Sequence, residues 1–492
     1  MEATSPVQPT VQPTAHVETK VYKVPNPYPL TLAGMLAALG PQAINFGISI
    51  GGGEAYLLPN VAARGTLHMH WLLLVSLLLE TVLVYEVIKY SMATGRSFFV
   101  ATRDLPPKGF WPWFWAVAAA LTYAWPAWLS GAAAAAYRFT GLSLPIPGLP
   151  PHYLWAAVAL VMVLLVFYFS NVIYRNLARI FTAVMFLNIA VVLLVALLTV
   201  RLEDIGVVLS GYLGLTLLAQ GYPEQLPKLD ALALFNQPGG SLMWVSLWVI
   251  EAGFGLGAYV GKVTGVLRPP EQVNTEELPW DHKNPEEMRK MKGWVSLGGW
   301  SLIIWWAIIG GFLMTFLYSL IGYSYLHREV VARGGAVPAN LEIPIQVATI
   351  TGGVLGPLAF AVMLLFVMVT LYDGQFAYYD TFVARTATDA IATTRLRERR
   401  PYRFYYFLVV TVAVLAGFFL VTVDQPFALW LIVAVMSILF RSIGSLQILL
   451  INRARLPAEL HPSPFNTAVL WFSFFAGFVA VGIWAYFRFL GG

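Results

Sequence analysis

The chain has 492 residues, of which 58% are hydrophobic and only 11% are charged. Soluble domains carry about 25% charged residues, so this composition excludes a soluble protein and predicts an integral membrane protein. Cysteine is absent, which excludes a disulfide framework, haem attachment and thiol chemistry, and the net charge of +5 gives no support for nucleic-acid binding.

Residues 1–29 precede the first apolar segment. Met1 to Lys20 is rich in Pro, Gln, Thr and Val, and it lacks the basic start and apolar core of a signal peptide. We expect residues 1–29 to form a disordered cytoplasmic tail.

The first apolar segment, about residues 30–62, is interrupted by three glycines and a glutamate: Gly51, Gly52, Gly53 and Glu54. Each glycine costs roughly 1 kcal/mol in a helix relative to alanine. A carboxylate at mid-bilayer costs several kcal/mol more unless it faces protein or water. Backbone leaves helical form at membrane depth only where protein buries it or where it lines a wet cavity. We therefore predict that the stretch from Ile50 to Glu54 breaks the first transmembrane helix and forms a binding site. The alternative is a glycine-rich contact between helices.

Ten further apolar segments follow, each near the ~20 residues that a bilayer requires. They cover approximately residues 71–90, 113–137, 153–169, 180–200, 242–263, 294–321, 354–372, 405–423, 427–451 and 467–487. With the N-terminus inside, the inner loops hold most basic residues, including the run from Arg395 to Arg400, as the positive-inside rule requires. We predict about 11 helices in the cell (plasma) membrane and a cytoplasmic N-terminus.

The sixth segment contains a second anomaly, in which Glu251 is followed by alternating glycines from Gly253 to Gly261. Because it stands five spans after the first anomaly, the two segments run in opposite directions. Paired interrupted helices in two inverted halves indicate the midplane site of a secondary transporter. We add Glu251, Gly253 and Gly255 to the predicted binding residues.

The chemistry of both breaks favours a hard cation, because exposed carbonyl oxygens and carboxylates are its preferred ligands. Glu54 and Glu251 are the predicted metal ligands and would bring two charges to one cavity. One of two close carboxylates could hold a proton instead. Neither break contains methionine or histidine, so a site for late transition metals is not indicated.

Other intramembrane charges suggest a proton pathway through Glu80, Glu86 and Arg441. Glu86 and Lys89 are three residues apart and are expected to pair. Arg441 needs a carboxylate partner, and Glu80 and Glu86 are the two choices. Asp373 and Asp380, seven residues apart, share a helix face at the end of the eighth segment, where they would line an exit, cap the helix or bind Arg385.

Four strings near the start of the chain resemble the Nramp family of divalent metal transporters, and more closely its divergent relatives: Gly40–Pro41, Gly47–Glu54, Glu86–Tyr90 and Ala93–Gly95. Residues 373–385 and 452–457 are also similar. The resemblance implies a LeuT-like fold of two inverted five-helix repeats and metal uptake coupled to protons. This chain has Gly51–Glu54 where the family has Asp-Pro-Gly-Asn, and Gly253–Gly261 lacks the family's Met-Pro-His string.

These patterns divide the chain into a tail, a first repeat, an extracellular connection, an inverted second repeat and an appended eleventh helix, at residues 1–29, 30–200, 201–241, 242–451 and 452–492. We expect an all-α secondary transporter for a cation, first a divalent metal ion, with no permanently bound cofactor and with a small ion or solute and the lipid bilayer as its partners. An amino acid or small organic cation is the alternative substrate. A channel or a membrane-embedded enzyme is the alternative class, but no nucleophile and base set supports an enzyme.

Overall fold

The computed structural model describes residues 20–50, 54–224, 228–334, 348, 352–353, 356–423 and 427–489. Within these ranges the regular structure is helical, and one isolated backbone bridge joins Tyr22 to Trp280. Seven described helices are long and apolar enough to cross a membrane. The predicted all-α membrane fold is confirmed. Residues 1–19 and the three glycines at 51–53 lie outside the described residues.

The helices of the first five predicted spans are α1 (Leu32–Ala37), α2 (Gly40–Ile50), α3 (Glu54–Ala63), α4 (Trp71–Thr94), α6 (Phe110–Tyr123), α7 (Ala127–Thr140), α8 (Tyr153–Phe169) and α9 (Ile173–Thr199). Helix α4 ends at Gly95, whose φ of +68° is the left-handed conformation that glycine adopts freely. The short helices α5 (Phe98–Ala101) and η1 (Thr102–Asp104) follow it. The third span is divided at Pro126, because proline has no N–H to donate to the preceding turn.

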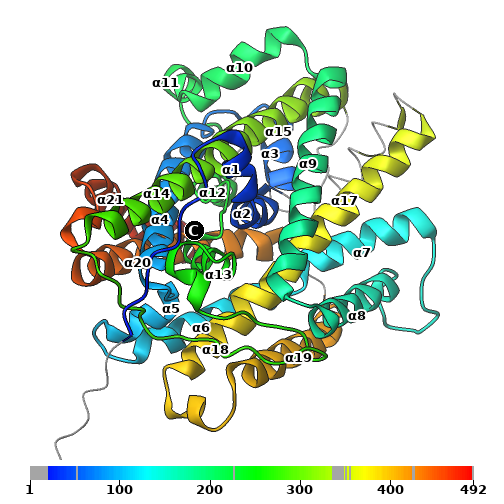
Figure 1. Cartoon of the computed structure of the whole chain (residues 1–492). Helices are drawn as coiled ribbons and strands as arrows, with labels where there is room; N and C mark the ends of the chain where they lie inside the picture. The colour runs from blue at the N-terminus through cyan, green and yellow to red at the C-terminus, as the bar shows by residue number, and fades with distance from the viewer. Residues whose placement is uncertain are drawn as a thin grey trace, which may run out of the picture.

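The connection after α9 forms α10 (Leu202–Tyr212) and α11 (Leu215–Gln220), which lie at one end of the molecule, at the top of Figure 1. The sixth span follows as α12 (Lys228–Leu234), η2 (Leu242–Trp244), α13 (Val245–Glu251) and η3 (Gly255–Tyr259). Helix α18 and the start of α19 lie at the opposite end (Figure 1).

The remaining helices are α14 (Pro285–Ser301), η4 (Leu302–Met314), α15 (Thr315–Ile321), η5 (Gly322–Val330), η6 (Val331–Arg333), α17 (Pro357–Ala377), η7 (Tyr378–Arg385), α18 (Thr386–Ala392), η8 (Arg395–Glu398), α19 (Tyr402–Leu420), α20 (Phe427–Arg455), η9 (Ala458–Leu460) and α21 (Pro464–Phe489). Helix α14 begins where the Asn284 side chain accepts a hydrogen bond from the Glu286 N–H (2.9 Å), and Pro285 occupies its first turn. Elements η4, η5 and η7 are π-helical.

Helix α2 lies in the interior, where it packs against α9, η4, α17 and α13. Ten of its eleven residues are buried, including the polar Gln42, Asn45 and Ser49. Helix α21 packs against α20 and α4 at the edge of the bundle (Figure 1). The interior around α2 is therefore the place where polar side chains from several helices can meet.

Candidate functional site

A buried non-helical stretch, residues 235–241, divides the sixth span between α12 and η2. Its polar residues Asn236, Gln237 and Ser241 are each at most 6% exposed. Helix α12 packs against α4, α20 and α21, so the stretch lies inside the helix bundle. The sequence-based boundary at residues 241/242 falls at the end of this stretch, and the alternating glycines used to predict the break lie beyond the end of α13.

Side chains from three helices satisfy the backbone of residues 235–241. Ser241 N–H donates to Asn45 Oδ1 of α2 (2.9 Å), and Gly240 N–H donates to Glu80 Oε2 of α4 (3.1 Å). The carbonyl of Phe235 accepts a hydrogen bond from Arg441 of α20 (2.9 Å). Buried backbone groups need such partners where no helix supplies them, so these contacts fix the conformation of the break.

Glycine is required at both positions that follow Pro238. Gly239 has a φ of +63°, and a Cβ on Gly240 would lie 2.6 Å from the Trp306 ring of η4. The indole N–H of Trp306 donates in turn to Ser49 Oγ of α2 (3.0 Å). The break in the sixth span is thus packed against the first span through a tryptophan that contacts both.

Glu54 lies beside this break. It is the first residue of α3 and only 3% exposed, and its Oε1 lies 3.6 Å from the position that a Cβ on Gly239 would take. It also interacts electrostatically with Glu80. Its second oxygen, Oε2, is buried without a hydrogen-bond partner in the described structure. This oxygen is therefore available to a ligand.

Further buried polar atoms of α2 and of residues 235–241 lack partners in the described part of the chain: Asn45 Nδ2, Asn236 Oδ1, Gln237 Oε1 and Ser241 Oγ. The described residues contain no group of three or more His, Asp or Glu side chains placed to hold a metal ion. A bound cation would therefore use Glu54 together with amide, hydroxyl and backbone oxygens, which are hard ligands. The sulfur of the nearby Met243 lies against Gly444 of α20, 2.3 Å from the position of a Cβ there.

The carbonyl of Ile50, the last residue of α2, already has a hydrogen-bond partner within the protein. It accepts a hydrogen bond from Asn188 Nδ2 of α9 (3.0 Å), and Asn188 Oδ1 accepts one from the Tyr318 hydroxyl (3.1 Å). The predicted binding residues Gly51, Gly52 and Gly53 lie outside the described residues.

The structure is similar to solved transporters over nearly its whole length. A crystal structure of a mutant of the Eremococcus coleocola manganese transporter matches with a TM-score of 0.64 and 14% identity, over 96% of this chain and 92% of that chain. Mhp1, a nucleobase-cation-symport-1 family transporter with bromovinylhydantoin bound, matches with a TM-score of 0.51 and 12% identity, over 92% and 93% of the two chains. No protein-family model and no curated protein sequence matches the chain.

The chain has the LeuT-type fold. This confirms the fold class that the sequence predicted. The described structure has a break at residues 235–241, between α12 and α13, whereas the sequence analysis placed the break at Glu251 and the glycines 253–261.

Glu251 occupies a different environment from Glu54. Its Oε1 accepts hydrogen bonds from an Arg385 guanidinium nitrogen and from the Val263 N–H (3.3 Å). Arg385 also binds Asp380 (3.0 Å), which accepts a hydrogen bond from the Tyr406 hydroxyl (2.6 Å). The prediction that Glu54 and Glu251 share one cavity is therefore not supported, because the end of α13 carries Glu251 to a cluster with η7 and α19.

The predicted binding residues Gly253 and Gly255 form the turn after α13. Their φ angles are +78° and +54°, and a Cβ on Gly255 would lie 2.4 Å from the Met92 carbonyl oxygen of α4. These glycines are required where the chain leaves the sixth span against α4. They explain the glycine pattern in the sequence without contributing a described ligand.

The predicted proton-pathway residues form two separate pairs. Arg441 binds Glu80 (3.1 Å) and Ser76 (2.5 Å), and both charged side chains are fully buried. Glu80 is thus confirmed as one of the two predicted partners of Arg441. Glu86 binds Lys89 (2.7 Å), as predicted, and its oxygens also accept hydrogen bonds from the side-chain amides of Asn452 in α20 and Asn466 in α21. Glu86 therefore joins the last two helices to α4.

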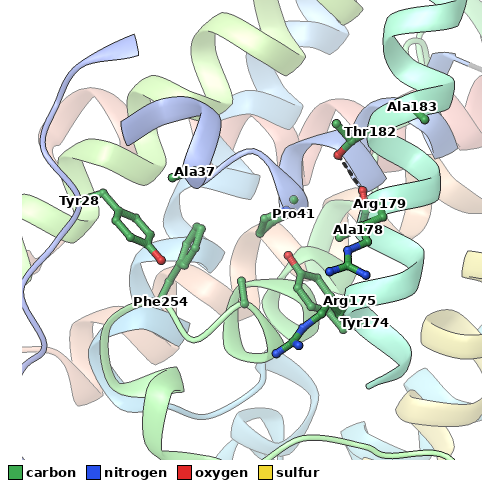
Figure 2. Close-up of a pocket in the computed structure, with 12 residues that line it drawn as sticks. Tyr28, Ala37, Pro41, Tyr174, Arg175, Ala178, Arg179, Thr182, Ala183 and Phe254 are labelled. Carbon is green, nitrogen blue, oxygen red and sulfur yellow. Dashed lines mark hydrogen bonds between the residues drawn. The ribbon is translucent and has the colours of Figure 1, made fainter. Parts of the chain in front are cut away.

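A cavity of about 450 Å³ opens beside the start of α2 (Figure 2). Its walls are Pro41 of α2, Tyr174, Arg175 and Arg179 of α9, and Phe254 from the turn after α13. It therefore borders the first span, the fifth span and the turn that leaves the sixth span.

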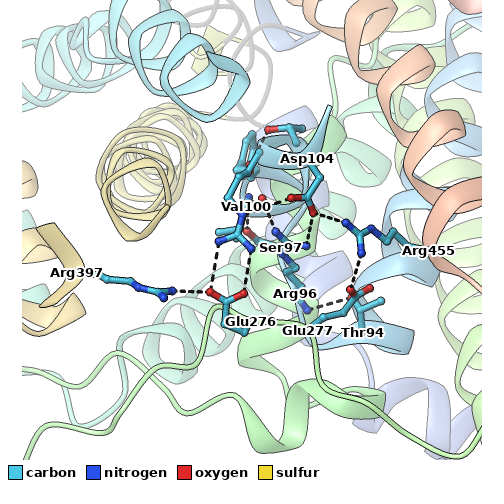
Figure 3. Close-up of polar contacts among 12 residues, drawn as sticks. Thr94, Arg96, Ser97, Val100, Asp104, Glu276, Glu277, Arg397 and Arg455 are labelled. Atoms are coloured by element: carbon cyan, nitrogen blue, oxygen red, sulfur yellow. Dashed lines mark hydrogen bonds and ion pairs between the residues drawn. The ribbon is translucent and has the colours of Figure 1, made fainter. Parts of the chain in front are cut away.

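An ion-pair network closes the end of the molecule that the charge pattern predicts to face the cytoplasm (Figure 3). We call residues 260–284, a connection without helix that includes turns at residues 266–268 and 282–284, the strap. Glu276 of the strap binds Arg103 (3.0 Å) and Arg397 (2.5 Å), while Asp104 binds Arg96 (3.0 Å) and Arg455 (2.8 Å). Hydrogen bonding from Arg103, together with Arg397, lowers the pKa of Glu276 to about 2.

Asn45 and Asn236 are the site residues that the sequence analysis missed. Asn236 belongs to the string Asn236-Gln237-Pro238-Gly239-Gly240, which combines a proline, two glycines and two amides between apolar segments. That composition is a signal of an interrupted helix. Asn45 carried no such signal, because a single amide in an apolar helix is also typical of a contact between helices.

Proposed function

We propose that the protein is a secondary active transporter that moves a cation by alternating access through a site at Glu54 and residues 235–241. The observation that carries the proposal is the unpaired Oε2 of Glu54, buried beside the break of the sixth helix. Irregular backbone in a transmembrane helix is typical of a transport site, and a buried carboxylate without a counter-ion requires a positive partner.

A divalent metal ion with hard-ligand preference is the proposed substrate. The available atoms are carboxylate, amide and hydroxyl oxygens, which suit Mg²⁺, Mn²⁺ or Ca²⁺ better than a soft metal. The manganese transporter of Eremococcus coleocola supports this choice as a neighbour in fold. Alternating access, with the N-terminus in the cytoplasm and the chain in the plasma membrane, completes the proposal.

Thermal unfolding of the purified chain with Mg²⁺, Mn²⁺ or Ca²⁺ tests the site. A ligand at 100 times its Kd stabilises a protein by about 2.7 kcal/mol, so at least one ion should raise the Tm. Glu54→Gln should abolish this rise, whereas Glu459→Gln, which changes an exposed carboxylate, should keep it. Uptake of the same ion into proteoliposomes should saturate and should disappear in E54Q. A Tm rise that persists in E54Q would place the metal site elsewhere. Single-channel currents would show that the protein works as a channel and not as a transporter.

A small organic cation is the second candidate substrate. Tyr378 stacks on Tyr123 with a ring separation of 5.1 Å, and it lies within electrostatic reach of Glu54. Aromatic faces next to a carboxylate attract ammonium groups. Choline and simple alkylamines therefore belong in the same Tm panel; a response to them alone, lost in E54Q, would assign the site to an organic cation.

A further inference from the structure

A second cavity, of about 710 Å³, lies where the start of α14 meets the connection between α20 and α21. Its walls come from three parts of the chain: the end of the strap (His282 and Lys283), the first turns of α14 from Pro285 to Lys292, and residues 457–459. It shares no residue with the proposed cation site, so passage of the cation does not explain it.

The lining of this cavity is basic. Three cationic side chains, those of Lys283, Arg289 and Lys292, line it against a single carboxylate, that of Glu459. All three are exposed, and none of them has an ion-pair partner in the part of the chain that the structure describes. Lys290 of the same helix shows the contrast, because it binds two glutamates of α14 (3.0 and 2.9 Å). The cavity therefore gathers uncompensated positive charge, which suits an anion.

The cavity lies at one boundary of the membrane-spanning region. The candidate spans Pro285–Arg328 and Pro464–Tyr486 begin next to its lining residues, and the span Val433–Arg455 ends next to them. Helices α14, α20 and α21 all pack against α4, and α21 lies at the edge of the bundle (Figure 1). The basic side chains are therefore placed at the depth of lipid headgroups.

One exposed face of α14 leads from the cavity into the membrane. Arg289, Lys292, Ser296, Trp300 and Ile303 follow one another at intervals of 3, 4, 4 and 3 residues, so they share a helix face, and all five are exposed. Trp300 is 49% exposed and lies about 12 Å along the helix axis from Lys292, at 1.5 Å per residue. Tryptophan is enriched at the headgroup level of membranes. The order basic, polar, aromatic and apolar matches the order of phosphate, glycerol and acyl chain in a phospholipid.

We propose that this cavity binds the headgroup of an anionic phospholipid from the leaflet at the predicted cytoplasmic end. The phosphate binds Arg289 and Lys292, whose charges suit it, and an acyl chain lies along Trp300 and Ile303. Basic pockets between transmembrane helices on the cytoplasmic side recognise such headgroups. A soluble phosphate would neutralise the same charges but would leave the apolar end of the exposed face uncovered, so the face decides for a lipid.

The bound lipid joins the strap, α14 and residues 457–459, and it neutralises three like charges that otherwise repel one another. Anionic lipid should therefore stabilise the folded protein beyond the effect of a zwitterionic lipid. This proposal does not depend on the cation site, and E54Q should keep the response to lipid. Failure of either proposal therefore leaves the other intact.

Thermal unfolding in a non-ionic detergent tests the lipid site. Dioleoylphosphatidylglycerol should raise the Tm of the wild-type protein more than the same amount of dioleoylphosphatidylcholine does. Combined Arg289→Gln and Lys292→Gln should abolish this difference, and the milder Lys283→Gln should reduce it. The matched control combines Arg399→Gln and Arg400→Gln, which removes the same charge from exposed residues outside the cavity and should keep the difference.

Native mass spectrometry gives the second readout. Wild type and R399Q/R400Q should retain one phosphatidylglycerol molecule more than R289Q/K292Q, and Trp300→Ala should lower this retention. A Tm response of R289Q/K292Q equal to that of wild type overturns the proposal. An equal loss in R399Q/R400Q also overturns it, because the attraction would then be a property of the whole basic end. If inorganic phosphate alone reproduces the rise in Tm and W300A changes nothing, the occupant is a soluble anion and the lipid site is rejected.

Discussion

The centre of the molecule and its predicted cytoplasmic end use carboxylates in opposite ways. At the centre, Glu54 and Asp373 are buried, and each has carboxylate oxygen without a hydrogen-bond partner among the described residues. At the end, Glu251 binds Arg385, while Glu276 and Asp104 each bind two or more guanidinium groups. The same residue types occur in both regions, so composition alone does not distinguish them. What distinguishes Glu54 and Asp373 is that no arginine pairs with them in the described structure, whereas Glu80 at the centre is paired with Arg441.

This difference separates carboxylates that hold the structure together from carboxylates that can bind a cation. A paired carboxylate is neutralised by the protein and joins segments that are distant in sequence, such as α13 to η7 through Glu251 and Arg385. An unpaired buried carboxylate destabilises the empty protein and gains a partner only when a cation arrives. This contrast supports the proposed cation site at the centre, and it indicates that the carboxylates at the predicted cytoplasmic end hold segments of the chain together.

The largest expected effect comes from turning a paired carboxylate at the centre into an unpaired one. Arg441→Gln leaves Glu80 buried without its guanidinium partner and also removes the donor to the Phe235 carbonyl. Breaking a buried ion pair in this way costs about 3–5 kcal/mol. The measurement is thermal unfolding in detergent. Arg453→Gln, on the exposed last turn of the same helix, should stay within about 0.5 kcal/mol of wild type. A Tm of R441Q equal to that of R453Q would contradict the pair's role.

A smaller effect is expected for Glu251→Gln. Asp380 remains to neutralise Arg385, so the loss is one charged hydrogen bond in a buried cluster, about 1–3 kcal/mol. Glu251 is paired with Arg385 and lies outside the proposed metal site. E251Q should therefore keep the metal-induced rise in Tm that E54Q loses. If E251Q loses it too, the sequence-based prediction of a shared site is right and the assignment of Glu251 to the end region is wrong.

Much of the architecture was predictable because hydrophobicity and charge act over whole segments. Described helices fall in each of the eleven predicted spans. The Glu86–Lys89 pair was predicted, and Glu80 was one of the two predicted partners of Arg441, because isolated charges are costly in a membrane. The helical boundaries differ mainly at the interrupted spans. There the backbone is held by side chains from elsewhere in the chain, such as Asn45 and Arg441, and local sequence does not show them.

The position of the sixth break could not be read from glycine content. Gly239–Gly240 and Gly253–Gly255 both contain glycines with positive φ, but the first lies next to Glu54 and the second packs on Met92 at the end of α13. A glycine indicates a special backbone conformation or a close approach of another atom to the backbone, but it does not indicate how deep in the membrane the residue lies. The proline and amides around Gly239 were the better indication.

The spacing between α2 and α17 can be tested by Gly47→Ala. The new Cβ would lie 2.4 Å from the Phe181 ring and 3.2 Å from Asp373 Oδ2, so one of them must move. Overpacking of this kind costs about 1–3 kcal/mol. G47A should lower the Tm, and Phe181→Leu in the same chain should restore part of it. A Tm that G47A leaves unchanged would show that α2 does not pack on α17 as closely as described.

The smallest expected effect concerns the strap and depends on pH. The pKa of Glu276 is about 2 in the folded protein because Arg103 and Arg397 bind its carboxylate, whereas an unperturbed glutamate has a pKa of about 4.3. A carboxylate whose pKa is lowered by folding contributes stability above its unfolded pKa, and it loses this contribution as the pH falls toward its folded pKa. The strap should therefore be held fully at pH 6 and less well between about pH 4 and pH 2.

Glu276→Gln isolates this contribution, because it removes the charge from a side chain that is about half exposed and leaves Asp104 with its own arginines. Hydrogen exchange of the strap amides should be faster in E276Q than in wild type at pH 6, and the difference should shrink at pH 3, where wild type begins to lose the same charge. Glu398→Gln, beside Arg397 on exposed η8, should exchange like wild type at both values. Equal exchange in E276Q and wild type at pH 6 would mean that Glu276 does not hold the strap, and closing of this end would then depend on Glu251 and Asp104.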